Sequence, residues 1–294
     1  MIIVRLIGGL GNQMFQYALG RVLSLKWHSD LYLDLTHLTT PPPNITPRRY
    51  ALDKFNIEAD IASSGLLKQV PFSQKEIFLI GFRNFFTRKA IFQYVKEPTV
   101  NFNRGMLDLP DNVYLEGYWQ SEKYFAGISD VIRQDFIILP NPSERNQKIL
   151  DEIQECNSVS VHVRRGDYIT NPETRRIHFV CDEEYYRKAL EIIMKQIKNP
   201  HIFVFSDDTD WTDNHIMPDA PVTYITHNID KQSYEDMRLM MHCRHHIIAN
   251  SSFSWWGAWL GKKPGQLVVA PSRWYNTKLC NYSDRLPSDW IITI

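Results

Sequence analysis

Cysteine and long hydrophobic runs are both scarce in this sequence. The four cysteines, without a C-x-x-C pair or zinc-type spacing, are Cys156, Cys181, Cys243 and Cys280. This usage argues against a disulfide framework and indicates buried thiols in a reducing compartment. No run reaches membrane-spanning length, and the opening segment 1–10 is too short and too soon interrupted for a signal peptide or an anchor. We therefore expect a cytoplasmic protein, with at most peripheral contact with the inner face of the membrane.

An excess of charge of either sign is also absent. Lysine and arginine together number 33, as do aspartate and glutamate, so the formal net charge is zero. This balance argues against a nucleic-acid partner and still allows a local basic pocket. The 294 residues suffice for one large domain or two ordinary ones, and a hydrophobic content of 44% is ordinary for a soluble globular protein.

A proline-rich segment, Leu139–Pro142, is the best candidate for a domain boundary, because its two prolines break any helix or strand. We expect domains at 1–140 and 141–294. Beyond the boundary, helices and short apolar strands alternate, which predicts an α/β domain with a parallel sheet covered on both faces. Helices are predicted at 144–156, 182–198, 233–243 and 252–261, and strands at 158–164, 201–206, 222–225, 245–250 and 266–270.

The N-terminal half follows the same plan less regularly. A strand at 2–6 leads through a glycine-rich turn at 8–13 into a helix, for which Asn12 is the expected N-cap. Further strands are predicted at 31–35 and 113–118, and a helical stretch at 121–136. The segment 57–102 mixes short apolar runs with basic residues and is predicted to contain helices and loops.

The segment Ser158–Tyr168 reads S-V-S-V-H-V-R-R-G-D-Y and places two arginines at the end of an apolar strand. Ligands of open α/β sheets bind beyond the carboxyl ends of strands, and the guanidinium fork matches phosphate. One interpretation is therefore a diphosphate clamp of Arg164 and Arg165, with Gly166 in a tight turn and Asp167 orienting an arginine. The other interpretation is a surface salt-bridge cluster.

The segment Phe203–Trp211 reads F-V-F-S-D-D-T-D-W and allows three interpretations. Asp208-Thr209-Asp210 is a D-x-D sequence that holds a divalent metal in one class of glycosyltransferases. Asp207 could instead accept hydrogen bonds from a guanine, or the carboxylates could simply cap a helix. The arginine pair favours a metal-free site, since two guanidinium groups already offset diphosphate charge.

Three further segments carry candidate ligand contacts. Asn250–Leu260 (N-S-S-F-S-W-W-G-A-W-L) places serines at a helix N-terminus, an anion site, and predicts Ser251 or Ser252 as N-cap. We expect its tryptophans in the core and Ser251–Ser254 toward the ligand. Gly8–Gln13 could bring backbone amides close to a phosphate, although a plain tight turn is an equal alternative. Leu115–Phe125 (L-E-G-Y-W-Q-S-E-K-Y-F) has the composition of a sugar-binding wall.

Taken together, these peptides resemble the α-1,2-fucosyltransferases of glycosyltransferase family 11. The similar peptides are G-G-L-G-N-Q-M-F-Q-Y-A, G-Y-W-Q-S-E-K-Y-F, H-V-R-R-G-D-Y, F-S-D-D and N-S-S-F-S-W-W-G-A-W-L, in the family's order from residue 8 to 260. The resemblance implies a GT-B-like fold of two Rossmann-like halves facing across a cleft. The first half would bind the acceptor and the second half GDP-fucose. It further implies an inverting, metal-independent transfer of fucose to the 2-hydroxyl of a galactoside.

The resemblance also implies roles for individual residues. Arg164 and Arg165 correspond to the diphosphate-binding pair, and Asp207 to the carboxylate that reads guanine. The other implied donor contacts are Gly9, Gly11, Asn12, His162, Asp167, Ser206, Asn250, Ser251, Ser252 and Phe253, and the implied acceptor contacts are Tyr118, Trp119 and Gln120. Glu116, beside the acceptor wall, is a candidate base, and Asn12 could position the attacking hydroxyl instead.

No cofactor and no metal are expected, since GDP-fucose is itself a substrate. The expected partner is a galactose-terminated oligosaccharide or glycolipid, and the chain resembles the soluble bacterial enzymes that decorate surface polysaccharides. Two alternatives stay open: a metal-dependent GT-A glycosyltransferase that uses Asp208 and Asp210, and a glycan-binding protein without enzymatic activity.

Overall fold

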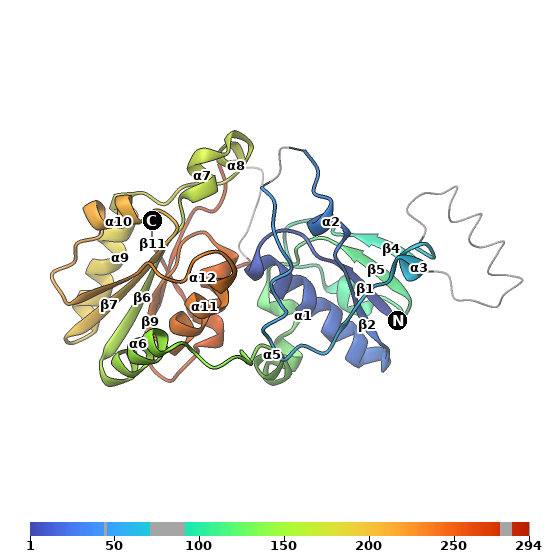
Figure 1. The fold of residues 1–294 in the computed structure, drawn as a ribbon, viewed down its shortest axis with the longest axis horizontal. Coiled ribbons are helices and arrows are strands. Elements are labelled where there is room, and N and C mark those ends of the chain that lie inside the picture. The colour runs from blue at the N-terminus through green and yellow to red at the C-terminus, as the bar shows by residue number, and fades with distance from the viewer. Residues whose placement is uncertain (44–45, 71–91, 277–283, 294) are drawn as a thin grey trace, which may run out of the picture. The chain divides into compact units, whose positions relative to one another are not determined.

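The computed structural model describes residues 1–43, 46–70, 92–276 and 284–293, which form two compact units (Figure 1). The first unit comprises Met1–Ile137 with Ser283–Arg285, and the second comprises Ile138–Tyr282 with Leu286–Ile294. Each unit is built around one parallel sheet accompanied by helices, so the predicted α/β class is confirmed. No helix of the described ranges is long and apolar enough to cross a bilayer.

The sheet of the first unit has the strand order β3-β2-β1-β5-β4, with every pair parallel. The strands are β1 (Ile2–Arg5), β2 (Leu31–Asp34), β3 (Asp60–Ile61), β4 (Gln93–Lys96) and β5 (Val113–Glu116). The chain builds outward from β1 to β3, then crosses to β4 at the opposite edge and returns to β5 beside β1. The boundary between β1 and β5 is therefore a topological switch point, where sheets of this kind bind ligands.

The main helix of the first unit is α1 (Leu10–Trp27), which is buried along most of its length. It begins three residues earlier than a helix capped by Asn12 would, because Gly8 adopts a φ of 81° and turns the chain directly into the helix at the N-cap Gly9. The prediction of Asn12 as N-cap is therefore wrong. The remaining helices among the described residues of this unit are α2 (Thr36–Thr39), α3 (Ser64–Leu67), η1 (Arg104–Asp108), η2 (Glu122–Tyr124), η3 (Ala126–Ile128) and α5 (Ser129–Asp135).

Three predicted elements of the first unit need correction. The stretch at 121–136 is not one helix but two 3₁₀ turns followed by α5, since Ser121 caps the first turn and Gly127 lies in the second. Strand β5 ends at Glu116 instead of residue 118, because the backbone amides of Tyr118 and Trp119 donate to the side chain of Glu97. The segment 57–102 contains strands β3 and β4 besides α3, and its residues 71–91 lie outside the described ranges.

The second sheet has the order β11-β10-β9-β6-β7-β8, again with parallel pairs. Its strands are β6 (Asn157–Val163), β7 (Pro200–Ser206), β8 (Val222–Ile225), β9 (His245–Ile247), β10 (Val268–Pro271) and β11 (Ile291–Thr293). Numbered from β6, this is the strand order of the Rossmann fold. The switch point lies between β6 and β9.

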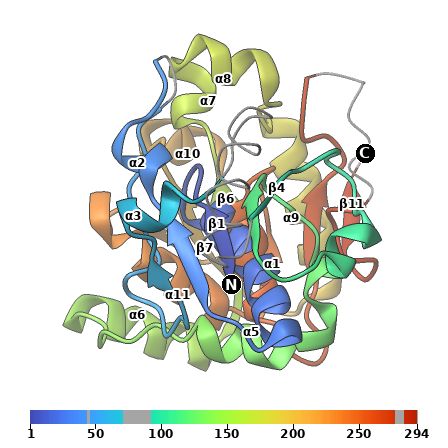
Figure 2. The same cartoon turned by 90° about the vertical axis from the view of Figure 1, so that its right-hand side faces the viewer.

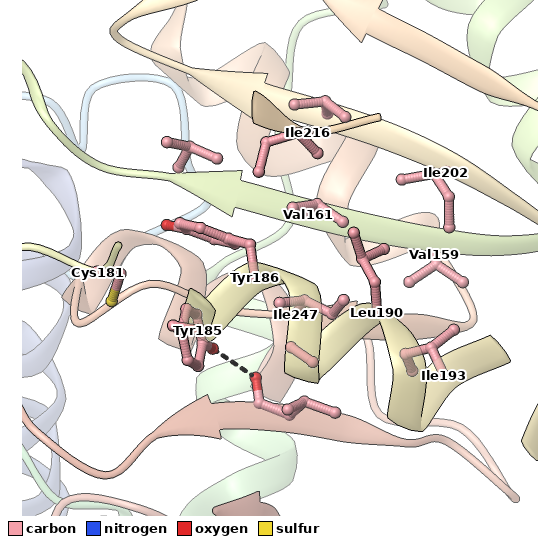
Figure 3. Close-up of a cluster of buried hydrophobic side chains, with 14 residues drawn as sticks. Val159, Val161, Cys181, Tyr185, Tyr186, Leu190, Ile193, Ile202, Ile216 and Ile247 are labelled. Carbon is pink, nitrogen blue, oxygen red and sulfur yellow. Dashed lines mark hydrogen bonds between the residues drawn. The ribbon is translucent and has the colours of Figure 1, made fainter. Parts of the chain in front are cut away.

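Both faces of this sheet are buried. Val159, Val161 and Val163 of β6 pack against α9 (Glu183–Gln196) through residues such as Tyr186 and Leu190 (Figure 3). The aromatic residues of β7 pack on the opposite face against α6 (Glu144–Glu155) and α11 (Ser233–His242). The other helices are α7 (Gly166–Thr170), α8 (Pro172–Ile177), α10 (Thr209–His215), η4 (Asp230–Gln232) and α12 (Ser252–Leu260).

The alternation predicted beyond residue 142 is present, with ends displaced by up to three residues. Sequence reasoning missed α7, α8, α10 and β11, and α7 and α8 lie side by side in both views (Figures 1 and 2). The strand expected at 245–250 ends at Ile247, and its last residues belong to the loop before α12. Cys181 and Cys243 are buried free thiols, as predicted, whereas the free thiol of Cys156 is only partly buried, and Cys280 lies outside the described residues.

Candidate active site

The switch point of the second unit brings two of the predicted motifs together. Strands β6 and β9 are neighbours, with Val161 paired with Ile247. Their carboxyl ends lead into the arginine loop, which we define as Arg164–Asp167, and into the serine loop, Asn250–Ser252. These segments are about 85 residues apart in the sequence and meet because the sheet topology reverses between them.

Asp207, at the end of the adjacent strand β7, organises the arginine loop. Its Oδ1 accepts hydrogen bonds from the backbone N–H groups of Arg165 at 2.8 Å and Gly166 at 3.0 Å. Its Oδ2 accepts a hydrogen bond from the Arg164 guanidinium. A Cβ atom at position 166 would lie 2.6 Å from that Oδ2, so only glycine allows the carboxylate to come this close. Gly166 is therefore needed because the Asp207 carboxylate lies against its backbone.

Arg164 is held by two carboxylates, those of Asp207 and Asp167. The orienting role predicted for Asp167 agrees with this contact. Burial alone would lower the pKa of Arg164, but the two neighbouring carboxylates outweigh it and raise the pKa. The guanidinium lies 5.4 Å from the centre of the Tyr168 ring, and the side chain keeps 22% of its surface exposed. Arg164 is thus a fixed, partly accessible cation.

Arg165 is held by a different set of groups. Its Nε donates to Asp208 Oδ2 at 3.0 Å, and its guanidinium lies 4.2 Å from the centre of the Trp211 ring. His215 stacks on the same ring at 4.5 Å, which fixes the plane that the guanidinium contacts. The two arginine side chains are therefore held in place by separate sets of groups.

Asp208 has further partners that bear on the D-x-D interpretation. Besides Arg165, it accepts the N–H of Trp211 at 3.1 Å and so caps α10, and its own N–H bonds to Ser206 Oγ at 2.9 Å. The helix-capping interpretation therefore describes Asp208. Across the described ranges, no three His, Cys, Asp or Glu side chains gather in a metal-holding arrangement.

His162, near the end of β6, is almost fully buried. Its Nδ1 bonds to Ser254 Oγ at 2.8 Å, and the ring contacts Phe253 at 5.5 Å. Burial lowers the pKa of His162 to about 4, so the imidazole is neutral at pH 7. Ser254 is consequently turned into the protein, and the prediction that it faces a ligand is wrong.

The serine loop is held by Asn250, whose amide donates to the carbonyls of Phe179 at 2.6 Å and Trp274 at 3.0 Å. Ser251 is the N-cap of α12, as predicted, and Ser252 begins the helix with a partly exposed side chain. The tryptophans of α12 are buried in the core: Trp255, Trp256 and Trp259. This arrangement directs the first amides of a nine-residue helix toward the switch point.

At the switch point of the first unit, the glycine-rich turn meets the predicted acceptor wall. Gln120 Nε2 donates to Asn12 Oδ1 at 2.7 Å. Two buried glutamines of α1 secure the turn, and sequence reasoning missed both. Gln13 bonds to the Gly8 carbonyl at 2.9 Å, and Gln16 bonds to the carbonyl of Gly117 at 3.0 Å. Gly9 and Gly11 lie at the start of the same helix.

Within the predicted acceptor wall, Tyr118 is 41% exposed whereas Trp119 is completely buried. The prediction that the Trp119 ring faces a sugar is therefore wrong, because the backbone at 119 turns with a φ of 47° and carries the ring into the core. Tyr118 and Gln120 remain the accessible candidates.

Glu116, the candidate base, is bound to Arg5 at 2.6 Å and to the Tyr94 hydroxyl at 3.0 Å. Burial alone would raise the pKa of Glu116, but these two hydrogen bonds outweigh it and lower the pKa. A carboxylate with a lowered pKa is a weaker proton acceptor than an ordinary glutamate.

Comparisons with known proteins agree with this geometry. The chain matches the model of Glycosyl transferase family 11 over residues 1–293. An Escherichia coli relative, alpha-1,2-colitosyltransferase, is 36% identical over 99% of this chain and 98% of its own length. A second E. coli relative, O-antigen biosynthesis glycosyltransferase WbnK, is 34% identical over 92% of this chain and 93% of its own. The solved structure of POFUT1 in complex with GDP-fucose covers 92% of this chain and 97% of its own, with a TM-score of 0.51 and 13% identity, and shares its fold. The expectation of a GT-B-like protein with two Rossmann-like halves is thereby confirmed, and the cleft between them stays a prediction.

Proposed function

We propose that this chain, which belongs to glycosyltransferase family 11, transfers L-fucose from GDP-β-L-fucose to the 2-hydroxyl of a galactoside. The reaction would be a hexosyl transfer with inversion at the fucose anomeric carbon. One observation carries the proposal: two separately braced arginines stand at the carboxyl end of β6, beside the switch point of a Rossmann-ordered sheet. That position and that charge suit the diphosphate of a nucleotide sugar.

The chemistry follows from where charge develops. As the glycosidic bond breaks, negative charge grows on the leaving diphosphate, and Arg164 and Arg165 stabilise it together with the N-terminus of α12. Because both guanidinium groups are already held by carboxylates and an aromatic ring, little reorganisation is needed during the reaction. The sugar passes through an oxocarbenium-like state, and the acceptor hydroxyl attacks from the opposite face.

Two residues of the first unit are candidates for handling the proton of the attacking hydroxyl. Glu116 is engaged by Arg5 and has a lowered pKa, which weakens it as a base. Asn12, oriented by Gln120, suits the alternative role of positioning the hydroxyl while a phosphate oxygen or water takes the proton. Neutral His162 has its Nδ1 engaged with Ser254 of α12, so this nitrogen is already committed to a partner within the protein.

A second candidate donor follows from the name of one relative, an alpha-1,2-colitosyltransferase. Colitose is fucose without its 3-hydroxyl, so GDP-colitose would place the same diphosphate against the same arginines. The α-1,2 linkage in that name supports attack by a 2-hydroxyl with either donor. The remaining expectations, a galactose-terminated glycan or glycolipid acceptor, a cytoplasmic location and independence from metal, belong to the same proposal.

The test is incubation of the full chain with GDP-fucose or GDP-colitose and a panel of galactosides, followed by linkage analysis of the product. We expect an α-1,2-linked fucosyl galactoside, formed equally well in EDTA. Transfer from GDP-colitose alone would identify colitose instead of fucose as the transferred sugar. Activity that is lost in EDTA and restored by Mg²⁺ or Mn²⁺ would support Asp208 and Asp210 as metal ligands. Glycan binding without any transfer would indicate a lectin.

A further inference from the structure

A carboxylate that sequence reasoning did not single out lies under the predicted acceptor wall. Glu97 directly follows β4, the edge strand next to β5. Its Oε2 accepts the backbone N–H of Tyr118 at 2.7 Å, and its Oε1 accepts that of Trp119 at 2.9 Å. Both oxygens thus bind consecutive amides of the segment Gly117–Gln120, which we call the wall loop.

The wall loop needs this support because its backbone is unusual. Trp119 has a φ of 47°, a strained conformation that aromatic residues rarely adopt. Glu97 can lie this close only because residue 117 is a glycine, since a Cβ at this position would lie only 2.3 Å from Glu97 Cβ. Two charge-assisted hydrogen bonds to one carboxylate offset the unfavourable turn.

The pKa of Glu97 is raised, because burial outweighs the opposing effects of the Tyr118 and Trp119 amides and of the buried Arg285. The neighbouring Asp284 reaches the same region, because its carbonyl accepts from Ser121 Oγ and its carboxylate binds Lys123. The wall loop is therefore held from below by Glu97 and at its end by the segment that carries Asp284.

The hydrogen bonds from the wall loop to Glu97 bear on ligand recognition because this loop carries the accessible candidates for acceptor binding. Tyr118 is exposed, and Gln120 bonds to Asn12 across the switch point. We propose that Glu97 is a positioning residue for the sugar acceptor, which holds Tyr118 and Gln120 in their binding arrangement without touching the donor. This inference rests on the proposed function for the identity of the acceptor class.

The test is Glu97→Gln in the full chain. Glutamine keeps one oxygen, so one of the two amides loses its acceptor and faces an NH₂ group instead. We expect kcat/KM for the galactoside to fall about tenfold, which corresponds to about 1.4 kcal/mol, while the Kd for GDP measured by calorimetry is unchanged. Amide hydrogen exchange should rise in residues 117–121 and stay constant in residues 159–166.

Two further variants sharpen the result. Gly117→Ala should reproduce the acceptor defect by forcing Glu97 away, whereas Glu58→Gln, at an exposed carboxylate of the same unit, should change none of these readings. Equal losses of acceptor turnover and GDP affinity, or unchanged exchange in residues 117–121, would overturn the proposal. If the wild-type chain transfers to no galactoside, the proposed function fails by itself. The exchange readout still tests the wall loop, and kinetics are then measured with whichever acceptor the panel identifies.

Discussion

Replacing Arg164 by lysine should damage this protein more than replacing Arg165 by lysine. The Arg164 guanidinium bridges two carboxylates, those of Asp207 and Asp167, with separate nitrogens. A lysine keeps the charge but has a single ammonium nitrogen, so it cannot span both partners in the same geometry. Losing one hydrogen bond between charged groups costs about 1.5–3 kcal/mol, and Asp207 would then release its hold on the arginine loop.

The Arg165→Lys substitution removes less interaction energy than Arg164→Lys. Lysine at position 165 can still lie over the Trp211 ring, and an exposed cation–π contact is worth about 0.5–1 kcal/mol. It gives up the hydrogen bond from Nε to Asp208, although Asp208 retains its role as the cap of α10. We expect kcat/KM to fall about a hundredfold or more for Arg164→Lys, the range seen when a donor to developing charge is removed, and less for Arg165→Lys.

The assay compares kcat/KM, GDP affinity and urea unfolding for both variants. Arg187→Lys is a matched control, since Arg187 pairs with Glu191 on the exposed surface of α9 with 58% of its side chain accessible. Near-normal kinetics and GDP affinity in both Arg164→Lys and Arg165→Lys would show that the arginines form a surface ion-pair cluster, and the reasoning would fail. A reversed order of sensitivity would refute the argument from the two carboxylates.

Three other predictions follow from the second unit. Gly166→Ala should weaken GDP binding at least about tenfold in calorimetry, since the new Cβ would lie 2.6 Å from Asp207 Oδ2. Gly127→Ala is the control and should leave GDP binding unchanged, because the space around its Cβ is open. Equal GDP affinities of the Gly166→Ala variant and the wild type would contradict the argument that Asp207 needs a glycine beside it. The guanine-reading role that the family resemblance implies for Asp207 predicts that GDP binds more tightly than UDP by about 1–3 kcal/mol, although both Asp207 oxygens already accept from the arginine loop; equal affinities would remove that role from Asp207. Finally, burial lowers the pKa values of His162 to about 4 and His246 to about 3, so the unfolded chain binds more protons than the native chain below the ordinary histidine pKa of about 6.5. The free energy of unfolding should therefore fall as pH drops from about 6.5 towards 4, His246→Gln should flatten this fall in urea titrations, and a variant as steep as wild type would exclude His246 as a source.

The motifs of the second unit were predictable because each follows a strand with a strong apolar pattern. Val159, Val161 and Val163 identify β6, and the polar residues after it must then lie at the carboxyl edge. The partners of the arginines were less accessible to such reasoning. Asp207 was assigned to guanine from sequence, yet its described contacts are the amides of Arg165 and Gly166 and the Arg164 side chain. Such pairings depend on strands that are adjacent in space.

The first unit was harder to predict for physical reasons. Strand β4 lies at the sheet edge, so its exposed Gln93 and Lys96 hide the apolar pattern, and β3 contains only two residues. The burial of Trp119 depends on a left-handed backbone turn that local composition does not indicate. Glu97 was missed because it serves backbone amides some 20 residues away, and no motif of its own marks it.

The return of Asp284 and Arg285 to the first unit has a consequence for how the protein is made. Ser121 and Lys123 bind Asp284, which lies more than 160 residues downstream. During translation, residues 1–137 emerge long before these partners exist, so the region around the wall loop can be completed only after residues 284 and 285 have left the ribosome. A fragment that stops after residue 137 would lack those contacts however long it is given to fold. Maturation of the proposed acceptor side is thereby tied to synthesis of residues 284 and 285, and a ribosome that stalls before them would release a first unit with an unfinished wall loop.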